Sequence, residues 1–354
     1  MPPAIVNFGY AASPARHPGA PQTQERTPRV GEEAHGHVDC QYPAFRIPAL
    51  RSAPVDRSFD HNPGPTVIYL DHNATTPVHP EVRRLLLQCL DEAWANPSSG
   101  YSPARDSRAV LDAARIEVAG LLGAAPEEIV FTSGGTESVN TAIASAVRLQ
   151  PGKPLTLISS VEHSACEHAA IDAVGESKVL RLRVDRDGRY DLDQLADILA
   201  THAPRIAIAS LMWANNETGV LPGIEAAADL ITGAGVLLHT DAVQAAGKVP
   251  VDLCSLPADY LSISGHKIFA PKGVGARFVR TGAPFHPLLH GGGQEDGRRS
   301  GTEPVALAAA LGAACQLVAG KLTTGALDAL RRRRDRFEQR LLALPGAHRN
   351  GHPV

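Results

Sequence analysis

From Val67 onward, short runs of apolar residues alternate with longer segments in which apolar residues recur every three to four positions. Short continuous runs are typical of strands buried on both faces, and the longer period is typical of helices packed on a sheet. The alternation predicts an α/β fold with a central, mainly parallel sheet flanked by helices. The predicted strands are 129–132, 155–159, 179–184, 206–212, 236–240 and 260–263, and the predicted helices are 80–94, 104–122, 137–148, 192–201 and 224–233.

The pattern also divides the chain into parts. Apolar segments at 275–279 and 305–317 continue the large domain, which we expect to span 66–320, and a long amphipathic helix is predicted from 326 to 344. Residues 1–65 are rich in Pro, His and Arg and lack a hydrophobic period, which predicts a disordered extension.

Composition excludes several classes of protein. With 44% hydrophobic residues among 354, the chain can bury a large core. A net charge of -3 provides no broad cationic field, so we expect no nucleic-acid partner, and no apolar stretch looks long enough for a membrane span. The five cysteines form no CxxC pair, which argues against a metal site and favours a reducing, cytoplasmic compartment.

Polar residues follow several predicted strands, at the sheet edge where α/β proteins bind ligands. In "FTSGGTES", a glycine turn at Gly134 and Gly135 leads into a helix that begins near Thr136. Backbone N–H groups at such a helix start favour a phosphate, although a capped turn without a ligand gives the same pattern.

Two further strand ends carry chemistry. Asp241 follows an apolar run, where a buried carboxylate needs a partner such as a pyridinium N–H, unless it caps a helix beginning near Ala242. In "SISGHKIFAPKG", Lys267 is either a surface charge or a desolvated amine that forms a Schiff base with an aldehyde, with Ser264 and His266 beside it for phosphate oxygens. A phosphate cradle, a carboxylate and a lysine together are the needs of pyridoxal phosphate.

Two other positions leave alternatives open. His163 follows the strand 155–159 and either lies over a cofactor ring or begins a helix with a satisfied hydrogen bond. Asn216 and Glu217, in "WANNETG", either orient a ring oxygen or close a turn.

These residues stand in longer motifs that resemble a known family. "YLDHNATTPVHPEV", "EIVFTSGGTES", "SSVEH", "WANNETGV", "HTDAVQAAGK", "SGHKIFAPKGVGA" and "HGGGQEDGRRSGTE" resemble the cysteine desulfurases of the NifS and IscS kind. These enzymes are class V aminotransferases within fold type I of the pyridoxal-phosphate enzymes. The resemblance covers nearly everything from Val67 to Glu303, and it implies a cofactor-binding large domain with that fold.

The resemblance also implies roles for individual residues. Lys267, His163 and Asp241 would be catalytic: the lysine bonds to pyridoxal phosphate, the histidine stacks on its ring and the aspartate pairs with its nitrogen. The implied cofactor-binding residues are Gly135, Thr136, His163, Asn216, Asp241, Gln244, Ser264, His266, Lys267 and Thr302, the last reaching the phosphate from the other subunit of a homodimer. The implied substrate-binding residues are Asn73, Ala74, Thr75 and Asn216, with Thr76 in the same segment.

The implied reaction removes sulfur from L-cysteine, which leaves alanine and a protein persulfide for iron–sulfur cluster or thiolation pathways. A sulfur-acceptor or scaffold protein is an implied partner. A selenocysteine lyase and a non-catalytic cofactor-binding dimer subunit are the alternatives.

The resemblance differs at the end of the chain. The family's nucleophilic cysteine and a substrate-binding arginine lie in a small C-terminal domain, which we expect to be truncated here, with 321–354 forming a linking helix and its start. Cys315 lies on an apolar helical stretch and is expected to be structural, and Cys166 is a poor substitute as a nucleophile.

Overall fold

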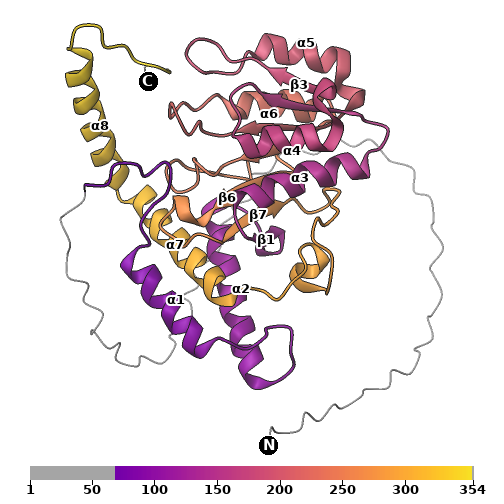
Figure 1. The fold of residues 1–354 in the computed structure, drawn as a ribbon, viewed down its shortest axis with the longest axis vertical. Helices are drawn as coiled ribbons and strands as arrows, with labels where there is room; N and C mark the ends of the chain where they lie inside the picture. The colour runs from indigo at the N-terminus through magenta and orange to yellow at the C-terminus, as the bar shows by residue number, and fades with distance from the viewer. Residues whose placement is uncertain (1–67, 353–354) are drawn as a thin grey trace, which may run out of the picture. The chain divides into compact units, whose positions relative to one another are not determined.

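A computed structural model describes residues 68–352, and the predicted extension 1–65 lies outside them. The centre of the described part is a seven-stranded sheet of order β1-β7-β6-β5-β4-β2-β3 (Figure 1). Six strands run in one direction, and β7 runs in the opposite direction. The strands are β1 Ile129–Thr132, β2 Leu155–Ser159, β3 Val179–Leu182, β4 Ile206–Met212, β5 Leu237–Asp241, β6 Tyr260–Ser264 and β7 Gly275–Val279. The predicted α/β fold with a mainly parallel sheet is confirmed.

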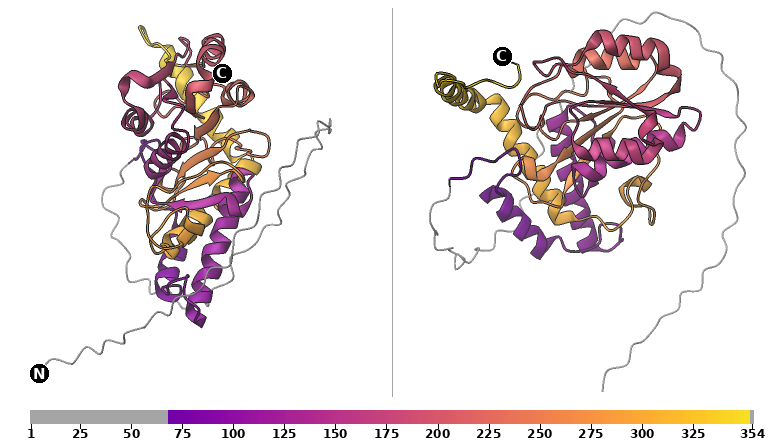
Figure 2. Two further views of the ribbon diagram at one scale, coloured as in Figure 1. Left: turned by 90° about the vertical axis from the view of Figure 1, so that its right-hand side faces the viewer. Right: turned by 45° about the horizontal axis from the view of Figure 1, so that its top comes forward.

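The described part of the chain contains eight α-helices. They are α1 Pro80–Glu92, α2 Ser102–Leu122, α3 Gly135–Leu149, α4 Ser164–Val174, α5 Leu192–His202, α6 Ile224–Gly233, α7 Val305–Thr323 and α8 Ala326–Leu342. The views in Figures 1 and 2 agree that α1, α2 and α7 lie together, and α7 packs along both of the others.

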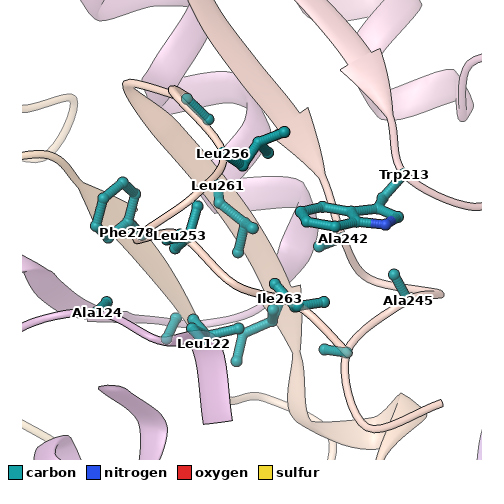
Figure 3. Close-up of a cluster of buried hydrophobic side chains, with 14 of the residues drawn as sticks. Leu122, Ala124, Trp213, Ala242, Ala245, Leu253, Leu256, Leu261, Ile263 and Phe278 are labelled. Atoms are coloured by element: carbon teal, nitrogen blue, oxygen red, sulfur yellow. The ribbon is translucent and has the colours of Figure 1, made fainter. Parts of the chain in front are cut away.

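Alternate strand residues face two different helix layers. Leu238, Leu261 and Phe278 belong to the largest apolar cluster, together with residues of α2, α5, α6 and α7 (Figure 3 shows part of it). Ile158 and Tyr260 point to the other face, where they pack with α4 and α3 respectively. Burial on both faces explains why the strands are continuous apolar runs rather than alternating ones.

Two details of local structure differ from the sequence analysis. The list of predicted helices lacks α4, although a helix start at His163 was one of the two alternatives, because this short helix is rich in small alanines, which blur its hydrophobic period. No helix begins at Ala242, since residues 242–259, all described, form turns and irregular backbone between β5 and β6. Asp241 is instead the last residue of β5.

The expectation that no stretch is long enough for a membrane span is also wrong. Within residues 68–352, α7 is the helix that is long and apolar enough by length and composition. Its apolar face is a protein core, however: Ala308, Leu311 and Ala314 are fully buried, and a Cβ added to Gly312 would lie 2.8 Å from the Cα of Ala114 in α2. Close helix–helix packing therefore accounts for its composition.

Candidate active site

A cavity of about 380 Å³ lies at the carboxyl ends of the strands, beside the first turns of α3 and α4. Such an edge is where open α/β sheets bind ligands. The structure brings most of the predicted site residues to this one cavity. Its lining includes Asn73, Ala74, Gly135, Thr136, His163, Asn216, Asp241, Gln244, Ser264, His266 and Lys267.

Lys267 is half-buried in a single 3-10 turn that directly follows β6. Its Nζ donates hydrogen bonds to the carbonyl oxygens of Asn73 and Ala74, the second at 3.0 Å. Burial lowers the pKa of this amine, against the attraction of Asp241 and other nearby carboxylates. The amine is therefore held at the cavity by a segment almost two hundred positions away in sequence.

Asp241 is 8% exposed at the end of β5. Its Oδ1 accepts a hydrogen bond of 2.9 Å from the Val243 amide, and the residue also lines the cavity. Burial raises the pKa of this carboxyl group, while His163 and Lys267 favour its ionised form. A cationic N–H donor entering the cavity would compensate the charge of Asp241, as a protonated pyridine nitrogen does.

The start of α3 is the part of the cavity whose backbone suits an anion. No side chain caps this helix at Gly134, so the amides of its first turn are available to a ligand. Glycine is required for the close approach: a Cβ on Gly135 would lie 2.7 Å from Val243 Cγ2, and one on Gly275 would lie 2.6 Å from the Ile263 carbonyl. Ser264, at the end of β6, adds a hydroxyl beside these amides.

His163 occupies the helix-start position that one of the two sequence alternatives predicts. It is the N-cap of α4, with Nδ1 accepting a hydrogen bond of 3.1 Å from the Ala165 amide, and it also lines the cavity. Because Nδ1 is an acceptor, the neutral ring carries its proton on Nε2. The ring is thus held in one tautomer by the helix that it caps.

Asn216 and Glu217 also line the cavity, and their side chains are hydrogen-bonded to each other at 2.7 Å. The Asn73 side chain is 3.5 Å from the Asn216 carbonyl oxygen.

Three other residues of the predicted site have different positions. Thr76 donates through its hydroxyl to the His266 carbonyl at 2.9 Å, and Thr75 shares a hydrogen bond of 3.1 Å with the His266 ring. Both therefore hold His266, a residue of the cavity lining, through hydrogen bonds. Thr302 is exposed and lies outside the lining of this chain's cavity.

Sequence reasoning missed two ionisable residues that bond to residues of the cavity lining but do not line it themselves. The carboxyl group of Glu162 is buried, and its Oε1 accepts from the Ser159 hydroxyl at 2.6 Å and the Met212 amide at 2.8 Å. Burial raises its pKa to about 8. Lys248 donates to Gln244, and burial lowers its pKa to about 8. Glu162 lies within "SSVEH" and Lys248 ends "HTDAVQAAGK", and this position in the quoted motifs was a signal that could have found them.

None of the four cysteines in residues 68–352 lines the cavity. Cys166 is fully buried and its Sγ lies 3.1 Å from the Ser210 hydroxyl, and burial raises its pKa well above the usual range. Cys315 is buried in α7, where burial likewise raises its pKa. Both thiols are therefore poor nucleophiles, in agreement with the prediction.

Comparison with known proteins supports this geometry. The family model of the class-V aminotransferases matches residues 68–353. The chain belongs to the class-V aminotransferase family. A cysteine desulfurase from Cereibacter sphaeroides is 45% identical over 293 residues, which cover 81% of this chain and 73% of the relative. The cysteine desulfurase NifS of Azotobacter vinelandii is 46% identical over 254 residues, covering 70% of this chain and 62% of NifS.

Solved structures give the same relationship. A NifS-like protein superposes with a TM-score of 0.73 at 33% identity, covering 79% of this chain and 77% of that one. The structure of SspA in complex with cysteine has a TM-score of 0.66 at 34% identity, and the match covers 70% of this chain and 72% of the SspA chain.

Members of this family depend on pyridoxal phosphate, and the cavity of this chain fits that cofactor. The uncapped start of α3 suits the phosphate, the buried Asp241 suits the ring nitrogen, and Lys267 provides the amine that bonds to the aldehyde. The family expected from the sequence and its cofactor are therefore confirmed.

Proposed function

We propose that this chain is a pyridoxal-phosphate-dependent cysteine desulfurase. It takes sulfur from L-cysteine, releases alanine and leaves the sulfur as a persulfide on a protein thiol. The observation that carries the proposal is the convergence of Lys267, Asp241 and the uncapped start of α3 on one cavity. The cysteine desulfurase relatives and the cysteine complex of SspA give the substrate. No comparison favours selenocysteine lyase or a non-catalytic subunit.

The side chains divide the chemistry between them. The bound cofactor supplies an electron sink that makes the α-proton of the amino acid acidic. Lys267 has a pKa lowered by burial, so its neutral amine is accessible as the base that takes this proton. Asp241 keeps the ring nitrogen protonated, and the Nε2–H of His163 can donate to substrate or ring atoms.

The assembly and location of the protein are further parts of this proposal. We infer a homodimer in which Thr302 of each subunit reaches the phosphate of the other, which is supported by its exposure outside its own cavity. A sulfur acceptor in iron–sulfur cluster assembly fits the NifS relatives. A cytoplasmic location is supported by Cys89, Cys166 and Cys315, all of which are reduced thiols.

Removal of Lys267 tests the function. Purified wild type should be yellow, borohydride should fix the cofactor covalently to Lys267, and L-cysteine should yield alanine. Lys267→Ala should lose borohydride fixation and fall at least a thousandfold in alanine formation, whereas the exposed-lysine variant Lys178→Met should behave as wild type. A wild type that binds no pyridoxal phosphate would refute the proposal.

A further inference from the structure

Lys248 lines a cavity that neighbours the cofactor cavity. It follows Gln244 by four positions in the turns after β5, and it lines a second cavity of about 530 Å³. This second cavity shares Asn73, Ala214 and Gln244 with the cofactor cavity. Lys248 is half-buried, so its ammonium group has exchanged part of its hydration for protein contacts.

The contact that Lys248 makes fixes the orientation of an amide. Its Nζ is bonded to Gln244 Oε1, while Gln244 Nε2 donates to the Asn73 carbonyl oxygen at 2.9 Å. An ammonium group only donates hydrogen bonds and a carbonyl oxygen only accepts them. Rotating the amide by half a turn would therefore oppose donor to donor at Lys248 and acceptor to acceptor at Asn73.

The fixed amide has one consequence at the cofactor cavity. Gln244 is 9% exposed and lines that cavity, and one of its two Nε2–H groups is engaged by Asn73. The other N–H is thus a donor available to a ligand. The same Asn73 carbonyl accepts from Lys267, so one short chain of hydrogen bonds links Lys248 to the catalytic amine.

We propose that Lys248 is a positioning residue: its ammonium group fixes the orientation of the Gln244 amide, whose Nε2–H contact with an oxygen of the cofactor ring is already implied by the family resemblance. The chemical class of that acceptor is a phenolic oxygen, which in its anionic form gains most from an N–H donor. This inference rests on the cofactor of the proposed function. It does not depend on sulfur transfer.

Three variants separate positioning from packing. Lys248→Met removes the ammonium group and keeps a side chain of similar length, and Lys248→Arg restores a cationic donor. Gln244→Glu keeps an acceptor for Lys248 but removes the N–H donor. Lys178→Met, on an exposed lysine that lines neither cavity, is the matched control.

The readouts are the dissociation constant of pyridoxal phosphate from apo-protein, the absorbance maximum of the bound cofactor, and the melting temperature of the apo-protein. Lys248→Met and Gln244→Glu should shift the absorbance maximum in the same direction and raise the dissociation constant about tenfold or more, as expected for a hydrogen bond to a charged group. The dissociation constants of Lys248→Arg and Lys178→Met should stay within about threefold of the wild-type value.

Two results would overturn the inference. One is a Lys248→Met protein with wild-type affinity and spectrum while Gln244→Glu is altered. The other is a Lys248→Arg protein that folds but has the raised dissociation constant and the shifted absorbance maximum of Gln244→Glu. This second result tests the inference even if Lys248→Met fails to fold. A wild type that binds the cofactor but forms no alanine refutes only the desulfurase proposal, and a wild type that binds no cofactor refutes both.

Discussion

At the scale of single residues, the sheet below the cavity contains a buried polar chain that carries no charge. The His239 ring is bonded to the Ser210 hydroxyl at 2.7 Å and to the Ser262 hydroxyl at 2.8 Å. Burial lowers the pKa of this histidine to about 3, so the ring is neutral at physiological pH. The carboxylate of Asp241, two positions further along β5, is therefore not offset by a charged histidine beneath it.

Glu162 should make the apo-protein less stable as the pH rises. Its folded pKa of about 8 exceeds the ordinary value of 4.5, so its contribution to stability is complete below pH 4.5 and is lost as the pH rises towards 8. Glu162→Gln removes this titration. Relative to wild type, the variant should gain about 2–3 kcal/mol of unfolding free energy between pH 5.5 and 7.5, measured by urea denaturation of both apo-proteins.

Comparing the two proteins cancels the titration of groups that they share. The glutamine of the variant would keep an acceptor for Ser159 and Met212, and its NH₂ group would replace Oε2 of Glu162, which has no hydrogen-bond partner among the described residues. Any cost of that buried amide is independent of pH. A difference that stays constant across this pH range would contradict the prediction.

The cysteines should differ sharply in reactivity. Cys254 is exposed, whereas Cys89, Cys166 and Cys315 are buried, and burial raises the pKa of Cys89 to about 11. Alkylation by iodoacetamide depends on accessible thiolate. We expect Cys254 to react at least tenfold faster than the three buried thiols, as followed by peptide mass spectrometry, with the urea-unfolded protein as the control in which these four described cysteines all react.

At the scale of elements, two close approaches determine how helices meet their neighbours. The starts of α3 and β7 pack through Gly134 and Gly275, where an added Cβ would lie 2.7 Å from backbone. Helices α2 and α7 pack through Ala114 and Gly312. In both places the absence of a side chain allows the backbones to approach, once near the cavity and once in the core.

Two glycines of α7 provide a matched test. Gly312→Ala should destabilise the protein by about 1–3 kcal/mol because its Cβ would meet the Ala114 backbone. Gly320→Ala has open space around its Cβ and should stabilise by about 0.5–1 kcal/mol, since alanine favours the helix. Urea denaturation measures both. Equal effects of the two substitutions would show that the α2–α7 contact is looser than described.

The predictability of these elements follows from their burial. The strands at 129–132, 155–159 and 206–212 match the predicted bounds because both of their faces are buried and their apolar runs are continuous. The position of β7 between β1 and β6, antiparallel to both, was not predicted, since its pairing depends on contacts distant in sequence. For α4, only a helix start at His163 was considered and its extent was not predicted, because alanine carries little hydrophobic signal.

At the scale of the whole molecule, the site is assembled from segments that are far apart in sequence. Gly135, His163, Asp241 and Lys267 reach one cavity because the carboxyl ends of parallel strands share an edge, and Asn73 joins them through the hydrogen bonds that its carbonyl accepts from Gln244 and Lys267. The sequence predicted this convergence through strand-end chemistry and family resemblance. It did not predict Lys248 or Glu162, whose importance comes from burial and from hydrogen bonds visible only after folding.

Cofactor binding should therefore stabilise a defined part of the fold. Pyridoxal phosphate bound in this cavity would be surrounded by several segments, and a ligand at a hundredfold excess over its dissociation constant adds about 2.7 kcal/mol of unfolding free energy. Hydrogen exchange of apo- and holo-protein should show added protection in the 71–76 segment, at the start of α3 and at 264–268. Helix α8 lies outside the lining of the cofactor cavity and is the internal control.

Because Lys267 joins the 71–76 segment through the Asn73 and Ala74 carbonyls, engaging this amine with the cofactor changes those bonds directly. Protection confined to α8, with none at these three segments, would contradict the assembly of the site described here.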